Sequence, residues 1–215
     1  MKNLIDLYIR LENIAKSNGL SIDDLKELSR SRSNHIDISI DDLYIIIDSI
    51  DFVIKEYSFT NYENLPWHVS NLAKEILNHE KNYKTIDGNF ISSIEESFVD
   101  LMLQNKLEKE RRYVGFAPCL KNVSIDFSND KQFYKSELFS YSDYDYLIDF
   151  VNITKRFISD YCNVNEVKIN DNQIDLFVNE IQVSSFNRRK YKDYVWVSGT
   201  LISLPRFSSA LKLNE

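Results

Sequence analysis

Several residue types that build common active sites are scarce in this sequence. The 215 residues include 4 Gly, 3 Pro, 3 His and 2 Cys. Loops that cradle phosphates are hard to build with so few glycines, and the chain has no P-loop, GxGxxG, GxSxG, HExxH or paired CxxC motif. Cys119 and Cys162 have neither the spacing of metal ligands nor the number needed for a disulfide framework. The sequence therefore predicts no metal site and no cofactor.

Long apolar runs are also missing. No uninterrupted apolar stretch approaches the roughly 20 residues that span a bilayer. The start, MKNLIDLYIRLE, carries charges at Lys2, Asp6, Arg10 and Glu12 and is not typical of a signal peptide. Because both cysteines are expected to be reduced, we predict a soluble, cytoplasmic protein without a membrane partner.

Aromatic residues and acidic charge are what the chain has in plenty. Phe, Tyr and Trp make up 13% of the residues and hydrophobic residues 43%, which is typical of an ordered globular protein. The formal net charge is −7, and most of it lies before residue 113. An acidic surface repels nucleic acid, so a basic protein is the electrostatically easier partner.

The first 112 residues have the apolar spacing of helices. Apolar side chains recur every three or four residues over 4–15, and further helices are predicted over 66–80 and 90–113. The cleanest apolar stripe in the chain, over 43–57, consists of Leu43, Ile46, Ile47, Ile50, Val53, Ile54 and Tyr57. This stripe predicts a helix even though its β-branched residues have strand propensity.

The second half of the chain changes to the alternating pattern of strands. Residues 144–162 are predicted to form a helix, and 206–215 a loosely held tail. Strands are predicted at 113–119, 122–127, 166–169, 173–178, 180–186 and 194–204. The fold class expected is α+β, with a helical N-terminal half packed against a mainly antiparallel sheet plus one crossing helix in the C-terminal half. The change of type divides the chain into a helical region, 1–112, and an α+β region, 113–215, either as two regions or as one continuous domain.

Carboxylates alternate with aromatic rings in FSYSDYDYLIDF, residues 139–150. Ser142 and Asp145 have the spacing of a helix-capping pair, so most of this pattern indicates the start of a helix, with Tyr144 on its inner side. Four side chains are predicted to point outward, namely Tyr141, Asp143, Tyr146 and Asp149.

Acidic side chains also lie on the side of helix 43–57 that is opposite the apolar stripe, and Glu95, Glu96 and Asp100 add acidic surface on the next long helix. Such a surface is either a solvated helix face or a docking face for a basic protein. The predicted partner-binding residues are Asp41, Asp48, Asp51, Tyr141, Asp143, Tyr146 and Asp149. The function predicted from them is a non-enzymatic acidic inhibitor of bacterial or phage origin, such as an immunity protein, an antitoxin or an anti-defence factor.

An alternative interpretation is nucleic-acid binding or processing. The segment NRRKYKDY places four basic side chains around Tyr191, in the predicted connection between two strands, and these are Arg188, Arg189, Lys190 and Lys192. Basic side chains with an interleaved ring are typical of contacts with single-stranded nucleic acid, but they also protect exposed sheet edges from aggregation.

Two further patterns contain residue types that are used in catalysis. The spacing of Arg30 and His35 resembles the arginine–histidine arrangement of HEPN-type ribonucleases, which implies general acid–base work by His35 and stabilisation of phosphate charge by Arg30 or Arg32. The other interpretation of that segment is a polar connector. Asp175 followed by Glu180 resembles part of a metal-dependent nuclease site, but Gln182 stands where a lysine is needed. An outward-pointing Asp175 and a Glu180 in a turn explain that pattern better.

Overall fold

The computed structural model describes residues 40–78, 89–120, 132–204 and 206–212. Its centre is a seven-stranded sheet in which β1 runs parallel to β4 and the other neighbours are antiparallel. The strand order across the sheet is β1 (Thr60–Tyr62), β4 (Arg111–Leu120), β5 (Gln132–Tyr141), β9 (Tyr194–Ser203), β8 (Ile181–Tyr191), β7 (Gln173–Val178) and β6 (Asn165–Asn170). A separate two-stranded sheet pairs β2 (His68–Val69) with β3 (Asn89–Phe90).

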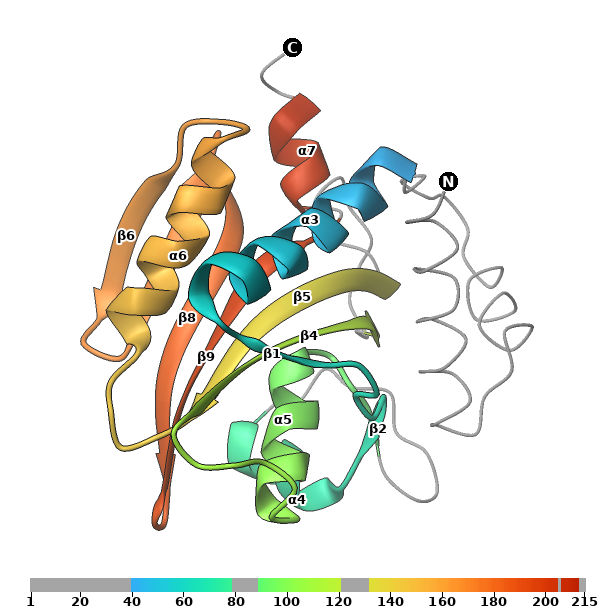
Figure 1. Cartoon of the computed structure of the whole chain (residues 1–215), viewed down its shortest axis with the longest axis vertical. Coiled ribbons are helices and arrows are strands. Elements are labelled where there is room, and N and C mark those ends of the chain that lie inside the picture. The colour runs from blue at the N-terminus through green and yellow to red at the C-terminus, as the bar shows by residue number, and fades with distance from the viewer. Residues whose placement is uncertain (1–39, 79–88, 121–131, 205, 213–215) are drawn as a thin grey trace.

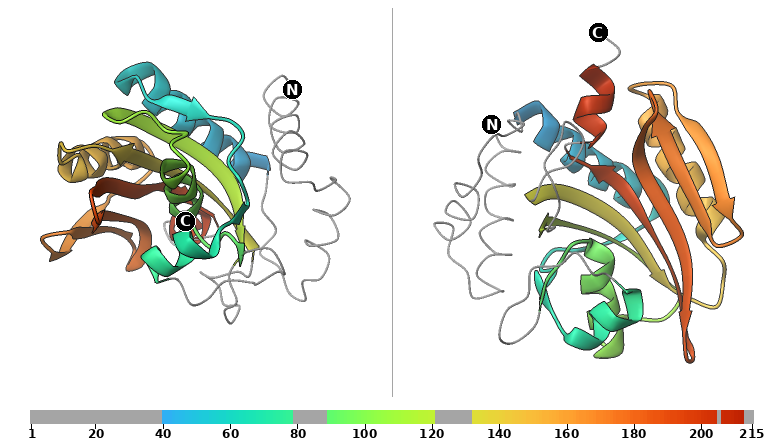
Figure 2. Two further views of the ribbon diagram at one scale, coloured as in Figure 1. Left: turned by 90° about the horizontal axis from the view of Figure 1, so that it is seen from below. Right: turned by 180° about the vertical axis from the view of Figure 1, so that it is seen from behind.

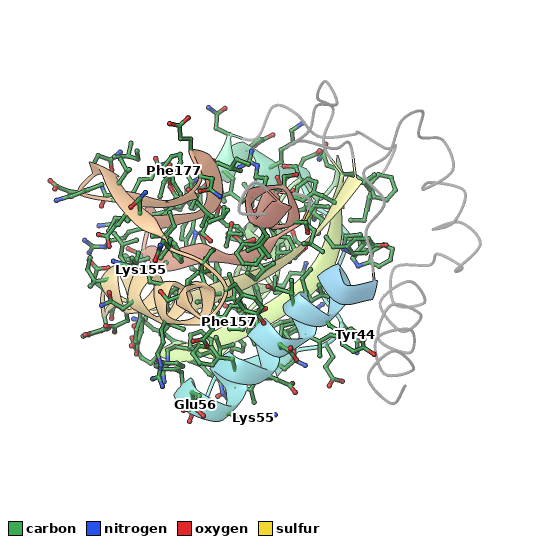
Figure 3. The ribbon with its side chains drawn as sticks, turned by 90° about the horizontal axis from the view of Figure 1, so that it is seen from above. Tyr44, Lys55, Glu56, Lys155, Phe157 and Phe177 are labelled. Atoms are coloured by element: carbon green, nitrogen blue, oxygen red, sulfur yellow. The ribbon has the colours of Figure 1, made fainter. Side chains whose placement is uncertain are left out.

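Two helices cover one face of the large sheet. They are α3 (Ile40–Tyr57) and α6 (Leu147–Ser159), which lie side by side in front of the strands in Figure 1. Ser49 of α3 meets Ser136 of β5 through their hydroxyl oxygens at 3.1 Å, and the rings of Phe52 and Phe157 join the two helices at 5.5 Å between centroids. Phe157 is labelled between them in Figure 3. We call this side of the sheet the helix-covered face.

The opposite face is covered at its β4–β5 side by α5 (Ile94–Leu103), and α4 (Asn71–Leu77) packs against α5. The ring of Phe98 in α5 stacks on that of Phe139 in β5, with 4.9 Å between centroids. Seen from behind, the strands lie in front of α3 and α6 (Figure 2, right). The last helix, α7 (Arg206–Lys212), packs near the β7–β8 turn, where the Asn179 side chain donates a hydrogen bond to the carbonyl of Ala210.

The coarse fold prediction is confirmed, since the chain is α+β with a mostly antiparallel sheet flanked by helices. The stripe over 43–57 lies in α3, where Ile46, Ile50 and Val53 are at most 1% exposed, so helical spacing outweighs β-branched propensity. The division between residues 112 and 113 stays a prediction, although β1 from the first region pairs with β4 from the second.

Two predicted helices were placed wrongly. The helix expected over 66–80 begins only at Asn71, because Ser70 is its N-cap and accepts a hydrogen bond from the Ala73 amide at 3.3 Å. Before it, residues 68–69 form β2. The helix expected over 90–113 ends at Leu103, and Arg111 already begins β4.

Two segments of the second half also differ from the prediction. Residues 132–141 form β5, a strand that the alternation did not reveal because Ser136 and Glu137 are buried polar residues within it. The expected tail is α7, in which Phe207 and Ala210 are fully buried. The strand predicted at 122–127 lies outside the described residues.

The start of α6 differs in detail from the predicted cap. The helix begins at Leu147, whose amide donates to the Asp145 carboxylate at 3.0 Å. Tyr144, expected on the inner side, is 58% exposed. Tyr141 and Tyr146, expected to point outward, are half-buried against Tyr194 and Phe150. None of the helices in the described ranges is long and apolar enough to cross a membrane.

Candidate functional site

Polar side chains cover the second face of the large sheet over β5, β9, β8 and β7. Successive residues of a strand point to opposite faces, and cross-strand partners share a face. Ser198 pairs with Phe139 on one side and Asn187 on the other, and Asn187 pairs with Gln173. We call this surface the polar face, and it comprises Lys135, Glu137, Gln173, Asp175, Phe177, Gln182, Ser185, Asn187, Arg189, Ser198 and Thr200.

The side chain of Glu95 in α5 lies over the polar face and accepts hydrogen bonds from three donors. Its Oε1 accepts hydrogen bonds from the Arg189 Nε at 3.0 Å, the Trp196 Nε1 at 2.9 Å and the Ser198 Oγ at 2.7 Å. The residue is 3% exposed. A carboxylate this deeply buried needs a cation and hydrogen bonds to offset its loss of hydration, and this set supplies both.

A second buried carboxylate, Glu137 of β5, lies beside the N-terminal end of α5. Its Oε2 accepts from the Glu95 amide at 3.1 Å and the Ser93 hydroxyl at 3.1 Å, and it forms an ion pair with the Lys135 Nζ at 3.1 Å. Negative charge is favoured at a helix N-terminus, which suits this position. Glu95 and Glu137 are therefore joined through the first turn of α5 and hold β5, β8 and β9 in one polar network.

The third buried carboxylate, Asp175 of β7, is 5% exposed and is held by neutral amides. Gln182 Nε2 donates to its Oδ2 at 2.7 Å, and Gln173 Nε2 donates to its Oδ1 at 3.3 Å. The Oε1 of Gln182 in turn accepts from Arg206 Nη1 at 2.8 Å, at the first residue of α7. Half-buried Phe177 pairs with Gln182 and lies on the side of β7 away from α6 (Figure 3). A ring, a guanidinium group, an amide and a carboxylate thus lie together here.

This arrangement can bind a ligand that has both charged and planar parts. A guanidinium group hydrogen-bonds phosphate or carboxylate oxygens and stacks on flat rings. A half-buried Phe ring offers a stacking surface for a base. No group of three metal-ligating side chains gathers within the residues that the structure describes.

The carboxylates of this site were misjudged from the sequence. Glu95, Glu96 and Asp100 were expected on an acidic surface, but all three are at most 6% exposed. Asp175 was expected to point outward, whereas it is buried on the polar face and Glu180 is exposed in the turn. The apolar residues around Glu95 and Asp100 were a signal that these carboxylates are buried. The whole of α5 from Ile94 to Met102 is in fact buried.

The predicted nucleic-acid residues lie in a hairpin whose turn is tighter than expected. Strand β8 continues to Tyr191, so only Lys192 and Asp193 form the turn before β9. Arg188 points to the helix-covered face, 3.6 Å from Asp145, while Arg189 points to the polar face and Glu95. Three cations are exposed, namely Arg188, Lys190 and Lys192.

The predicted acidic partner-binding residues are spread over α3, α6 and the segment before α6, and their role in binding a partner stays a prediction. Burial raises the pKa of Tyr161, just beyond the C-terminal end of α6, and the negative charge of Asp48 in α3 adds to this effect. Asp143 lies before the other end of this 13-residue helix and pairs with Lys109 at 2.6 Å. A 13-residue helix spans about 20 Å. Asp51 pairs with Lys55 within α3, and Asp149 lies in the first turn of α6. The Asp41 side chain, Arg30 and His35 lie outside the described residues.

The fold is that of the class II aminoacyl-tRNA synthetase catalytic domain. Seryl-tRNA synthetase from Pyrococcus horikoshii, solved with ATP, aligns with a TM-score of 0.63 and 18% identity over 79% of this chain and 49% of that one. Two structures of pyrrolysyl-tRNA synthetase from Desulfitobacterium hafniense align with TM-scores of 0.61 and 0.59. Their identities are 11% and 10%, and each covers 77% of this chain, with 65% and 67% of the other chain.

The chain therefore spans between half and two thirds of the length of these synthetases. No sequence family and no curated protein matches it in sequence.

These likenesses contradict the inhibitor interpretation. The predicted immunity protein, antitoxin or anti-defence factor has no support, because the chain has the fold of tRNA synthetases. One physical reason for the error is that net charge was read as surface charge, although Glu95, Glu96 and Asp100, which were counted as acidic surface, are buried. Buried, hydrogen-bonded carboxylates cannot dock a basic partner.

Proposed function

We propose that this chain is an ATP-using, RNA-binding domain of the synthetase type, which binds ATP on its polar face and RNA at the β8–β9 hairpin. The likeness to a seryl-tRNA synthetase solved with ATP supports the choice of nucleotide. The identities, all below 20%, leave the ligand to be argued from the side chains of this chain.

The observation that carries the ATP proposal is the group around Phe177, Gln182 and Arg206. The adenine ring would stack on the half-buried ring of Phe177. Arg206 would hold the phosphates, because a guanidinium group matches phosphate oxygens in charge and geometry. Its Nη1 is anchored on Gln182 Oε1 at 2.8 Å, which limits the rotamer freedom that binding would have to remove.

The RNA proposal rests on the hairpin tip. The cations of Lys190 and Lys192 are exposed there, and Lys192 lies 5.1 Å from the centroid of the Tyr191 ring. On the neighbouring strands Tyr194 and Tyr141 have ring centroids 5.6 Å apart. Cations beside rings bind a nucleic-acid backbone and its bases together.

Replacing Arg206 tests the ATP proposal. Arg206→Ala is expected to weaken binding of Mg·ATP at least tenfold in isothermal titration of the full chain, because it removes a charge-assisted contact with phosphate. The matched control is Arg188→Ala, which removes the same kind of side chain from the other face, beside Asp145. The control is expected to bind ATP within about twofold of wild type.

Thermal unfolding of both variants shows whether they keep the fold. Absence of saturable ATP binding by the wild type, or equal effects of the two substitutions, would contradict the proposal.

Reversing the hairpin charges tests the RNA proposal. Lys190→Glu with Lys192→Glu is expected to weaken binding of a fluorescent tRNA at low salt by at least tenfold in anisotropy titrations. If both lysines contact phosphates, the slope of log affinity against log salt should flatten by about 2. Lys74→Glu with Lys106→Glu is the control with the same change in net charge, and an equal loss in that variant would show that the hairpin has no special role.

A further inference from the structure

Strand β6 forms one edge of the large sheet and pairs, within the described residues, with β7 alone. It lies at the outer left of the molecule in Figure 1. All six of its residues are exposed, including Val167 at 43% and Ile169 at 50%. An edge of this kind presents a row of backbone donors and acceptors on which another strand can add.

The charged side chains of β6 lie on one face of the sheet and its apolar residue Val167 lies on the other. Glu166 lies on the helix-covered side, where Lys155 of α6 pairs with it at 2.9 Å, and Lys168, two residues along, shares that side. Lys155 is labelled on the outer side of α6 in Figure 3. Val167 pairs with Asp175 and therefore lies on the side of the polar face, while Ile169 lies at a register shift between Lys168 and Asn170.

We propose that β6 is a self-association edge, on which the β6 strand of a second copy of this chain pairs antiparallel. A two-fold axis perpendicular to the sheet through Val167 places Val167 opposite its own copy. The same axis places Glu166 of each copy opposite Lys168 of the other, within the regular part of β6 before the register shift at Ile169. Opposite charges that face each other across antiparallel strands stabilise the pair, so the edge is complementary to itself in this register.

The other symmetric registers are less favourable. An axis through Glu166 or through Lys168 places two like charges directly opposite each other, which destabilises the pair. An axis through Ile169 places Lys168 opposite Asn170 and extends the pairing into the turn at Asp171. A lysine on an edge strand normally discourages pairing, but here the glutamate two residues earlier supplies its partner in the second copy.

The ion pairs that Glu166 and Lys168 form within a single copy do not prevent them from pairing with the second copy. Glu166 and Lys155 have side chains 36% and 35% exposed, and Lys168 and Asp171 have side chains 63% and 92% exposed. Exposed pairs contribute little, so Glu166 and Lys168 can share or change partners at small cost. In the pair of copies the two sheets become continuous, and both polar faces open on the same side.

Sedimentation velocity of the full chain over a range of concentrations tests the proposal. Wild type is expected to show a concentration-dependent dimer, and Lys168→Glu to weaken it at least tenfold by placing Glu opposite Glu. The exchange variant, Glu166→Lys with Lys168→Glu, restores opposite charges in the same register and is expected to return the affinity to within about threefold of wild type. Lys55→Glu, with 71% exposure of the lysine side chain on α3, controls for the change in net charge.

Each other outcome overturns the proposal. If the wild type stays monomeric at all concentrations, the proposal is wrong and no variant is needed. The same result is expected if another segment of the same chain pairs with β6. A dimer that survives Lys168→Glu unchanged, or is weakened equally by Lys55→Glu, uses another surface. A failure of the exchange variant to restore the dimer, with its thermal unfolding unchanged, rejects the register. None of these results depends on ATP or RNA.

Discussion

Glu110 holds the start of β4 to the end of β5 from a backbone conformation with φ of 65°, which is uncommon for a residue with a side chain. Its carboxylate accepts hydrogen bonds from the Ser142 hydroxyl and from the Asp143 amide at 3.1 Å. The Ser142 hydroxyl first, and the Asp143 amide second, lower the pKa of Glu110 below its ordinary value. A group whose pKa is lowered in the folded state stabilises the fold above its unfolded pKa, and this contribution is lost as the pH falls through the folded pKa.

Glu110→Gln is therefore expected to lower the free energy of unfolding at pH 7 by about 0.5 kcal/mol, a small effect because solvent screens this exposed group. The difference from wild type should begin to shrink as the pH falls through about 4, the ordinary pKa range of a glutamate, and should close below the lowered pKa of the folded state. Urea denaturation at pH 7 and at pH 3.5 measures it, with exposed Glu63→Gln as the control. An equal loss of stability at both pH values would contradict the role of the carboxylate charge.

The burial and the partners of the polar-face residues could not be predicted from the sequence. Ile174, Leu176 and Val178 predicted a buried strand face correctly, since all three are at most 2% exposed. The same alternation placed Asp175 in solvent, because the pattern cannot show that the second face is also covered. Glu95 meets Trp196 and Ser198 more than 100 positions away. Such partners are set by the order of the strands, which local spacing does not determine.

At the scale of elements, periodicity predicted the regular parts and missed those built around buried polar residues. Helices α3 and α6 and strands β4, β6, β7 and β9 were predicted within a few residues. Pro118 was placed correctly near the end of its strand, since β1 accompanies β4 only over residues 113–115. Strand β5 was missed because Lys135 and Glu137 belong to the candidate site and break the apolar alternation. Helix α7 was missed because only tertiary contacts bury its apolar residues.

Helix α7 supplies a test at this scale. Phe207 is fully buried, and its ring meets that of Tyr161 with centroids 5.9 Å apart. Phe207→Ala is expected to lower the free energy of unfolding by about 3 to 5 kcal/mol, because it leaves a cavity in the core. Leu72→Ala, at a position 45% exposed on α4, is the control and should change it by about 0.5 kcal/mol or less. Equal small effects in chemical denaturation would mean that α7 is the loose tail predicted from the sequence.

At the scale of the whole molecule, the net charge of −7 does not describe the surfaces that matter. Glu95, Glu137 and Asp175 are buried and hydrogen-bonded, while Arg188, Lys190 and Lys192 are exposed on the β8–β9 hairpin. The sheet thus has a helix-covered face, on which α3 and α6 pack, and a polar face, on which ionisable side chains lie. This asymmetry, together with the synthetase fold, is what supports a ligand on the polar face.

Photo-crosslinking with an azido-adenine analogue of ATP tests that central claim most directly, because it reports where the base lies. The account predicts label that excess ATP displaces, on peptides of β7, β8 or the start of α7, and a loss of that label in Arg206→Ala but not in Arg188→Ala. Displaceable label on α3 or α6, under the opposite face of the sheet, would contradict it, and so would the absence of any label that ATP displaces.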